Sequence, residues 1–232
     1  MQREGLRMAE ELRLWPDVAV RLAWLGWIAM MRRAYPQARE YCERALRLAV
    51  EQGHQMAGVL AEIGLGLTAR RQGELEVAET HLRTLLKAVP QDADTVPPLY
   101  LPLIQVGLGY VAEQRGDAAT ALVLHRDALA VALRIDGPRD MAFSLEGLAG
   151  ALSLAGHHID AARLLGAAAS VRRSSGLAPG PAERDDIDRI TARIRSALPE
   201  DTFAAESGHG GTLSPADCMR DVATARLTGV HA

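Results

Sequence analysis

The chain has 232 residues, of which 48 % are hydrophobic and only 4 % aromatic, and its formal net charge is −3. A chain of this length can bury a sizeable core, about 70 to 75 % of the surface that it exposes when unfolded. Its apolar residues are mostly Ala, Leu and Val, which suit closely spaced helices. The slightly negative charge argues against general electrostatic binding of nucleic acid, and no apolar run is long enough for a membrane span.

The N-terminal segment and the cysteines favour a cytoplasmic protein. Residues 1–13 carry charges throughout and do not resemble a signal peptide. Cys42 and Cys218 are the only cysteines, and we expect both to be free thiols in a reducing compartment. The sequence therefore predicts a cytoplasmic location and no membrane partner.

Hydrophobic spacing and punctuation by Gly and Pro predict helices along most of the chain. We expect a short helix over 2–14 to end at Trp15-Pro16-Asp17, because proline disfavours a helical residue before it. This first segment, 1–16, is interpreted either as half of a hairpin whose other half is missing or as a capping helix. Four hairpins are predicted within 17–173, with helices at 17–33 and 36–53, 55–71 and 75–89, 98–115 and 118–135, and 139–155 and 158–173.

The remaining residues, 174–232, are predicted to form a linker, capping helices and a flexible tail. A helix over 182–198 carries an apolar stripe that must be buried. We expect it to cap the end of the fourth hairpin; the alternative is that it folds back into the groove as an internal mimic of a bound peptide. A short helical stretch near 199–205, a break at Gly208–Gly211 and a last helix over 215–227, with Ser214 as N-cap, complete the prediction.

Four alanines mark an internal repeat. Consecutive alanines are separated by 40, 43 and 40 residues. The longer interval contains the connection 89–97, which ends at the first proline of Pro97-Pro98. A fixed period of this size predicts stacked helical hairpins. Small residues twelve positions earlier are expected to face these alanines where the two helices of a hairpin approach closely. The alanines are Ala38, Ala78, Ala121 and Ala161, and the small residues are Gly26, Gly66, Gly109 and Ala149.

The repeats resemble tetratricopeptide repeats of the longer kind, over about residues 17–173. Residues 143–220 resemble the C-terminal end of large bacterial transcription regulators of the antibiotic-regulatory or LuxR-like ATPase type. The residues that carry this second resemblance are Leu145-Glu146-Gly147-Leu148-Ala149, Ala161-Ala162-Arg163-Leu164-Leu165-Gly166-Ala167-Ala168, Pro181, Glu183-Arg184, Arg193 and Phe203.

The resemblance implies an all-α, right-handed solenoid of helical hairpins with C-terminal capping helices. It also implies a non-catalytic interaction module, the regulatory or sensor region of a transcription regulator, with a protein, a peptide or neighbouring domains of a larger regulator as partner. The exposed repeat ends could also support a homo-oligomer. The chain has neither a Walker-type phosphate loop nor a helix-turn-helix, so it is interpreted as a fragment or a stand-alone relative without direct nucleic-acid binding.

In tetratricopeptide arrays the first helix of each hairpin lines the concave surface, and this defines a predicted binding stripe. Its aromatic and Met side chains suit an apolar group or a partner helix, and its arginines suit a carboxylate. The alternative for each residue is packing between hairpins, and the alternative function is a sensor of an apolar metabolite. The stripe comprises Val20, Trp27, Met30, Met31, Leu60, Ile63, Leu67, Arg70, Arg71, Val106, Tyr110, Glu113 and Phe143.

Catalytic chemistry has no support in the sequence. The adjacent His157 and His158 point in different directions on a helix and seldom bind one metal together. No Cys/His pair stands at a spacing that suggests a nucleophile and its base. We therefore expect no enzyme activity, no metal and no cofactor.

Overall fold

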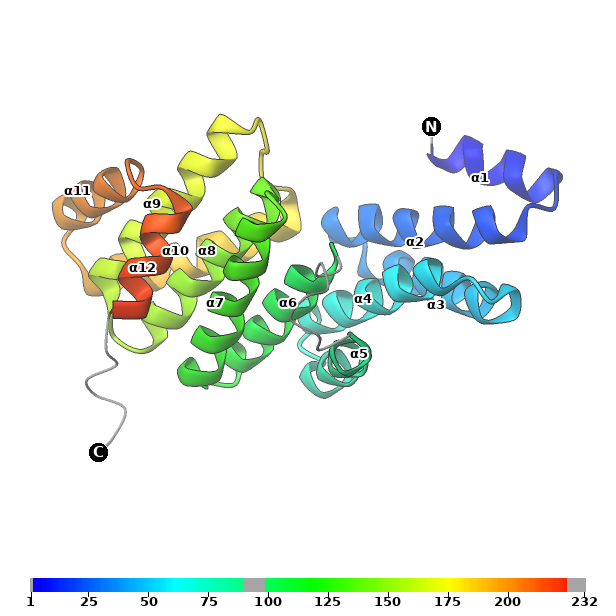
Figure 1. Ribbon diagram of the computed structural model, residues 1–232, viewed down its shortest axis with the longest axis horizontal. Coiled ribbons are helices and arrows are strands. Elements are labelled where there is room, and N and C mark those ends of the chain that lie inside the picture. Colours follow the sequence, from blue (N-terminus) through cyan, green and yellow to red (C-terminus); the bar gives the residue numbers. More distant parts are fainter. Residues whose placement is uncertain (1, 90–98, 225–232) are drawn as a thin grey trace. The chain divides into compact units, whose positions relative to one another are not determined.

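The computed structural model describes residues 2–89 and 99–224 of the chain. In this part of the chain the regular structure consists of twelve α-helices, with no strand, which confirms the predicted all-α class (Figure 1). The chain divides into two compact units, one of residues 1–95 with 180–184 and one of residues 96–179 with 185–232. None of the helices in the described ranges combines the length and the apolar character needed to cross a membrane.

The first unit is a run of helices in which each packs against the next. Short turns join the helices, so neighbours run antiparallel, and α2 also contacts α4. The helices are α1 (Gln2–Glu11), α2 (Trp15–Met31), α3 (Tyr35–Gln52), α4 (Gln55–Arg71) and α5 (Leu75–Ala88).

The break between α1 and α2 lies earlier than the sequence suggested. We expected Trp15 and Pro16 to end the first helix, but both belong to the first turn of α2. Arg13 ends the previous helix by adopting a left-handed backbone with φ of 55°. Proline is tolerated in a first helical turn because the N–H that it lacks has no partner there. The prediction was therefore wrong about which side of the break these residues occupy.

The second unit begins with two more hairpins, and its C-terminal helices pack onto them. Helices α11 and α12 both lie against α9, and α12 also contacts α7 (Figure 1). The first four residues of α10 are grouped with the other unit. The helices are α6 (Leu101–Gln114), α7 (Ala118–Arg134), α8 (Pro138–Leu154), α9 (His158–Ser174), α10 (Pro181–Ala197), α11 (Glu200–Gly210) and α12 (Pro215–Thr224).

Three of the small residues, Gly26, Gly66 and Gly109, lie where the two helices of a hairpin approach closely, as predicted. A Cβ added at Gly26 would lie 2.3 Å from Cys42 Sγ and 3.2 Å from the Ala38 carbonyl oxygen. A Cβ at Gly109 would lie 2.6 Å from the His125 ring. Both neighbours, Cys42 and His125, stand four residues after an anchoring alanine, so these hairpins share one packing register.

The turns inside the hairpins repeat this register. Gly73, Gly116 and Gly156 have φ values of 80°, 84° and 86°, a backbone that glycine adopts without strain. Arg33 stands at the equivalent place in the first hairpin and adopts the same left-handed region, with φ of 64°. The same turn therefore recurs in all four hairpins, although only three of them use glycine.

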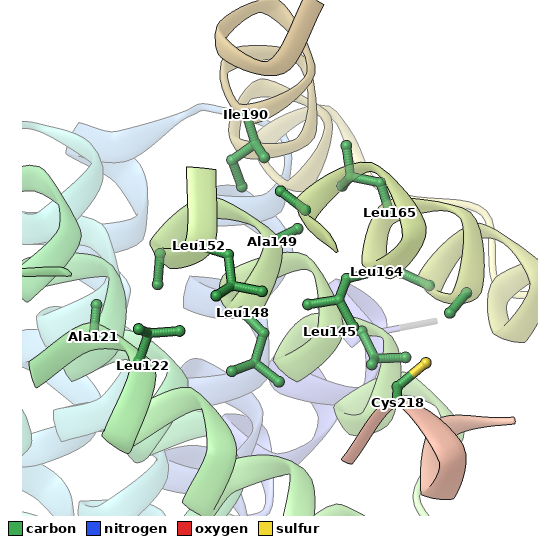
Figure 2. Packing of buried hydrophobic residues seen from close by; sticks show 14 of the residues in the cluster. Ala121, Leu122, Leu145, Leu148, Ala149, Leu152, Leu164, Leu165, Ile190 and Cys218 are labelled. Atoms are coloured by element: carbon green, nitrogen blue, oxygen red, sulfur yellow. The ribbon is translucent and has the colours of Figure 1, made fainter. Parts of the chain in front are cut away.

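The core of the second unit draws on its C-terminal helices as well as its hairpins. Ile190 of α10 points toward the region of Ala149, Leu152 and Leu165, and Cys218 of α12 lies beside Leu145 (Figure 2). Ile190 and Cys218 are almost fully buried. Thus α10 and α12 contribute buried side chains to this core.

The C-terminal prediction was partly wrong. We expected a break at Gly208–Gly211, but α11 continues to Gly210 because it packs directly on α9: a Cβ at Gly166 would lie 1.9 Å from the Ser207 carbonyl oxygen. Ser214 acts as N-cap as predicted, since its Oγ accepts from the Asp217 N–H at 3.1 Å. Residues 90–97 of the predicted connection 89–97 and the predicted end of the last helix at 227 lie outside the described residues.

Candidate functional site

In the first unit most of the predicted binding stripe is buried. Trp27 is 8 % exposed, and its indole Nε1 donates a hydrogen bond of 2.9 Å to the Leu60 carbonyl oxygen, which joins α2 to α4. Arg70 is only 1 % exposed. These contacts give Trp27 a packing role. The buried members of the stripe are Trp27, Met30, Ile63, Leu67 and Arg70, and the half-buried ones are Val20, Met31, Leu60 and Arg71.

In the second unit the predicted stripe makes specific contacts. Val106, Tyr110 and Glu113 are buried on α6, and the Tyr110 ring packs edge-on against His125 with 5.0 Å between ring centroids. Phe143 of α8 is half-buried, and the Arg172 guanidinium lies 5.1 Å from its ring centroid. These contacts join Tyr110 of α6 to His125 of α7, and Phe143 of α8 to Arg172 of α9.

Glu113 binds two arginines of α10. Arg189 donates to both carboxylate oxygens, at 2.6 and 3.2 Å, and Arg193 donates to one of them at 2.9 Å. The Glu113 side chain is 0 % exposed. Burial alone would lower the pKa of Arg189, but its hydrogen bonds with Glu113 and the charge of Glu113 outweigh burial and raise that pKa. Gly150 of α8 leaves the space that Glu113 fills, because a Cβ there would lie 2.7 Å from Glu113 Oε2.

These ion pairs place residues 185–197 of α10 on the face formed by α6 and α8, the first helices of the third and fourth hairpins. Arg193 also donates to the Gly150 carbonyl oxygen at 3.4 Å, and Ile190 and Ile194 are fully buried beside these arginines. We expected this helix to cap the end of the fourth hairpin. The contacts correspond instead to the alternative, in which the helix folds back over the predicted binding face.

A pocket of about 640 Å³ lies in the second unit beside this face. The C-terminal half of α9, the segment 176–179, α10 and α11 form its walls, and α8 contributes one residue. Most lining side chains are apolar: Leu165, Ala169, Leu177, Ala178, Pro179, Ile187 and Phe203. The rest of the lining consists of Gly176 and the polar residues Glu146, Arg172, Arg173, Thr191 and Ser207.

A buried ion pair fixes one side of the pocket. Arg172 Nε and Nη2 donate to the two carboxylate oxygens of Glu146 at 2.6 and 3.0 Å, and the two side chains are only 7 % and 4 % exposed. Arg172 also donates to the Leu177 carbonyl oxygen at 3.4 Å, which ties the segment 176–179 to α9. A bidentate pair of this kind sets a fixed geometry, so this part of the lining is preformed.

Another part of the lining comes from α11. Phe203 is 8 % exposed, and the Arg195 guanidinium lies 4.6 Å from its ring centroid. Arg163 of α9 donates to Glu206 of α11 at 2.6 Å, which links two of the helices that line the pocket. The pocket is therefore bounded by elements with specific contacts to each other.

The chemistry of this lining suits binding. It contains no cysteine and no histidine. Both cysteines are free and buried elsewhere, and burial, as the largest cause, raises the pKa of Cys42 to about 12 and that of Cys218 to about 11. Among the described residues, no group of His, Cys, Asp or Glu side chains is arranged to hold a metal ion. The pocket offers an apolar interior with a few polar groups.

Sequence reasoning did not find this pocket. The residues that line it come from four helices and a linker, and no short motif joins them. The resemblance did include three lining residues, Glu146, Leu165 and Phe203, although without a role for any of them. The signal that could have helped is the second arginine at the end of α9, since Arg172 and Arg173 cannot both face the same partner on a helix.

Comparisons with protein-family models and with curated proteins find no match for this chain. The functional conclusion therefore depends on the geometry of the chain itself.

Proposed function

We propose that the chain is a non-catalytic sensor module whose second unit binds a small apolar molecule in the pocket between α9, α10 and α11. The pocket itself is the observation that carries this proposal. Its volume of about 640 Å³ lies within the range of small-molecule sites, and an apolar lining with few polar groups is typical of them. This site differs from the concave groove that the sequence suggested, because α10 covers the α6 and α8 part of that face.

A pocket-filling substitution tests this function. N-phenyl-1-naphthylamine, a neutral apolar probe, should bind to the full chain, and Ala169→Trp should weaken this binding about tenfold or more, because the indole would occupy the pocket. Ala169 is an exposed lining residue, so the substitution leaves the core unchanged. Ala204→Trp, on an exposed position of α11 outside the lining, is the matched control and should bind the probe as the unmodified chain does. If calorimetric titration gave the two variants equal affinities for the probe, the pocket would not be its binding site.

A helix-binding interaction module is the second candidate. The observation that favours it is α10 itself, which lies on the α6 and α8 face with two arginines on Glu113 and two isoleucines in the core. An amphipathic partner helix with the same chemistry could use this face in exchange for α10. On this candidate a bound protein or peptide contacts α6 and α8 rather than the pocket lining.

For the wider context we propose a right-handed solenoid of tetratricopeptide-like hairpins that forms the regulatory region of a cytoplasmic bacterial transcription regulator. The recurring left-handed turn and the shared packing register support the repeat interpretation. The resemblance of residues 143–220 supports the link to regulators. Neighbouring domains of such a regulator, or a second copy of the chain at the repeat ends, would be its protein partners, and nucleic acid would be bound elsewhere.

A further inference from the structure

We propose that the pocket selects amphipathic molecules with a carboxylate group on an apolar body, and that Arg173 binds the carboxylate. This inference rests on the proposed small-molecule function and specifies the chemical class of the ligand. It assigns a role to a residue that neither the repeat pattern nor the resemblance singled out.

The charges in the lining favour an anionic ligand. Three charged side chains line the pocket: Glu146, Arg172 and Arg173. Glu146 and Arg172 form the buried bidentate pair and neutralise each other. The Arg173 side chain is exposed and forms no hydrogen bond or ion pair within residues 2–89 and 99–224. Among the described residues, no ion pair compensates this positive charge of the lining, and this favours an anion over a neutral or cationic ligand.

The choice of a carboxylate follows from the geometry of the donors. A guanidinium presents a planar fork of N–H groups that matches the two oxygens of a carboxylate. Thr191 and Ser207 add two hydroxyl groups to the lining, and neither side chain forms a hydrogen bond in the described part of the chain. A carboxylate has lone pairs for several donors and could accept from these hydroxyls as well.

The apolar walls determine the rest of the ligand. Leu165, Ile187 and Phe203 come from three different helices, and Leu177 and Pro179 come from the linker between α9 and α10. These side chains offer a hydrocarbon or aromatic body an environment without unmatched polar groups. A small polar acid would gain nothing from them, so the preferred ligand combines both features.

Arg173 also has an ordinary structural explanation. It lies in the last turn of α9, where a positive charge interacts favourably with the helix dipole. That role predicts an effect on stability but no effect on ligand choice. A matched arginine separates the two roles: Arg134 is also exposed in the last turn of a helix, α7, and lies outside the pocket lining.

The experiment compares 1-naphthoate with 1-naphthalenemethanol, which has the same ring system without the charge, by calorimetric titration of the full chain. We expect naphthoate to bind about tenfold more tightly, a ratio typical of one charge-assisted hydrogen-bonded pair. Arg173→Gln should abolish this preference, chiefly by weakening the binding of naphthoate. Arg134→Gln should retain the preference, and Arg173→Lys should keep part of it because the charge remains without the fork.

The outcomes separate this inference from the function on which it rests. Equal binding of the two compounds, or a preference that survives Arg173→Gln, would overturn the carboxylate assignment and leave the apolar pocket in place. Binding of neither compound would overturn both the assignment and the sensor function. A preference lost in Arg173→Gln and in Arg134→Gln alike would show a general effect of positive charge and would also contradict the role of Arg173.

Discussion

Asp140 shows how burial can outweigh a favourable helix position at the scale of a single residue. It lies in the first turn of α8, where the helix dipole favours a carboxylate. Burial nevertheless raises the pKa of its carboxyl to about 6, against the opposing effect of Arg139. The ionised form of this carboxyl is therefore less stable in the folded chain than in the unfolded one.

This shift predicts a pH-dependent stability. Because the folded-state pKa lies above the ordinary value of 3.8, the native state binds the proton more tightly, and stability falls as the pH rises from about 4 to about 6. Asp140→Asn should remove this cost and raise the free energy of unfolding at pH 7 by about 1 to 2 kcal/mol, with little effect near pH 4. Urea unfolding at the two pH values measures it. Asp188→Asn, an exposed position on α10, should change stability little at either pH.

Individual residues also show where sequence reasoning reached its limit. The repeat phase correctly placed Trp27 and Tyr110 on the first helices of their hairpins. It could not tell that Trp27 would donate to a backbone carbonyl on α4 or that Tyr110 would pack on His125. An aromatic side chain on a helix face has the same periodicity whether it lines an open groove or fills a helix interface.

At the scale of the elements, the hairpin depends on the absence of side chains at the close contacts. Gly26→Ala should destabilise the chain by about 1 to 3 kcal/mol, because the new methyl group would overlap Cys42 Sγ and crowd the Ala38 carbonyl oxygen. Gly58→Ala, within α4, meets only Ala49 Cβ at 3.7 Å and should stabilise the chain by up to about 1 kcal/mol through helix propensity.

Thermal and urea unfolding would compare these two variants directly. Adding Cys42→Ala to Gly26→Ala should restore part of the lost stability, because the sulfur that blocks the methyl group is gone. If both glycine variants were equally stabilised, the close approach of α2 and α3 would be contradicted.

The elements also differ in how far the sequence predicted them. Hairpin helices were predicted to within a few residues because Gly, Pro and apolar spacing act over one or two turns. The position of α10 was not, because it depends on Glu113, whose two arginine partners lie 76 and 80 residues further along the chain. Helix α11 continues to Gly210 because it packs closely on α9. The spacing of residues along the sequence does not predict this contact either.

At the scale of the whole molecule, the chain combines a regular scaffold with an irregular C-terminal part. In the second unit the hairpins supply α8 and α9, and residues 176–207 supply most of the remaining pocket walls. A repeat pattern predicts the scaffold because every hairpin obeys the same rule. It does not predict the pocket, because the residues that complete it follow no repeat.

The most direct test of the sensor proposal is an amide chemical-shift map of the full chain titrated with 1-naphthoate. We expect the largest changes at the end of α9, in 176–179, around Ile187 and Thr191, and around Phe203 and Ser207. Changes concentrated instead on Trp27, Ile63 or Tyr110, in the predicted binding stripe, or no change at all, would contradict it.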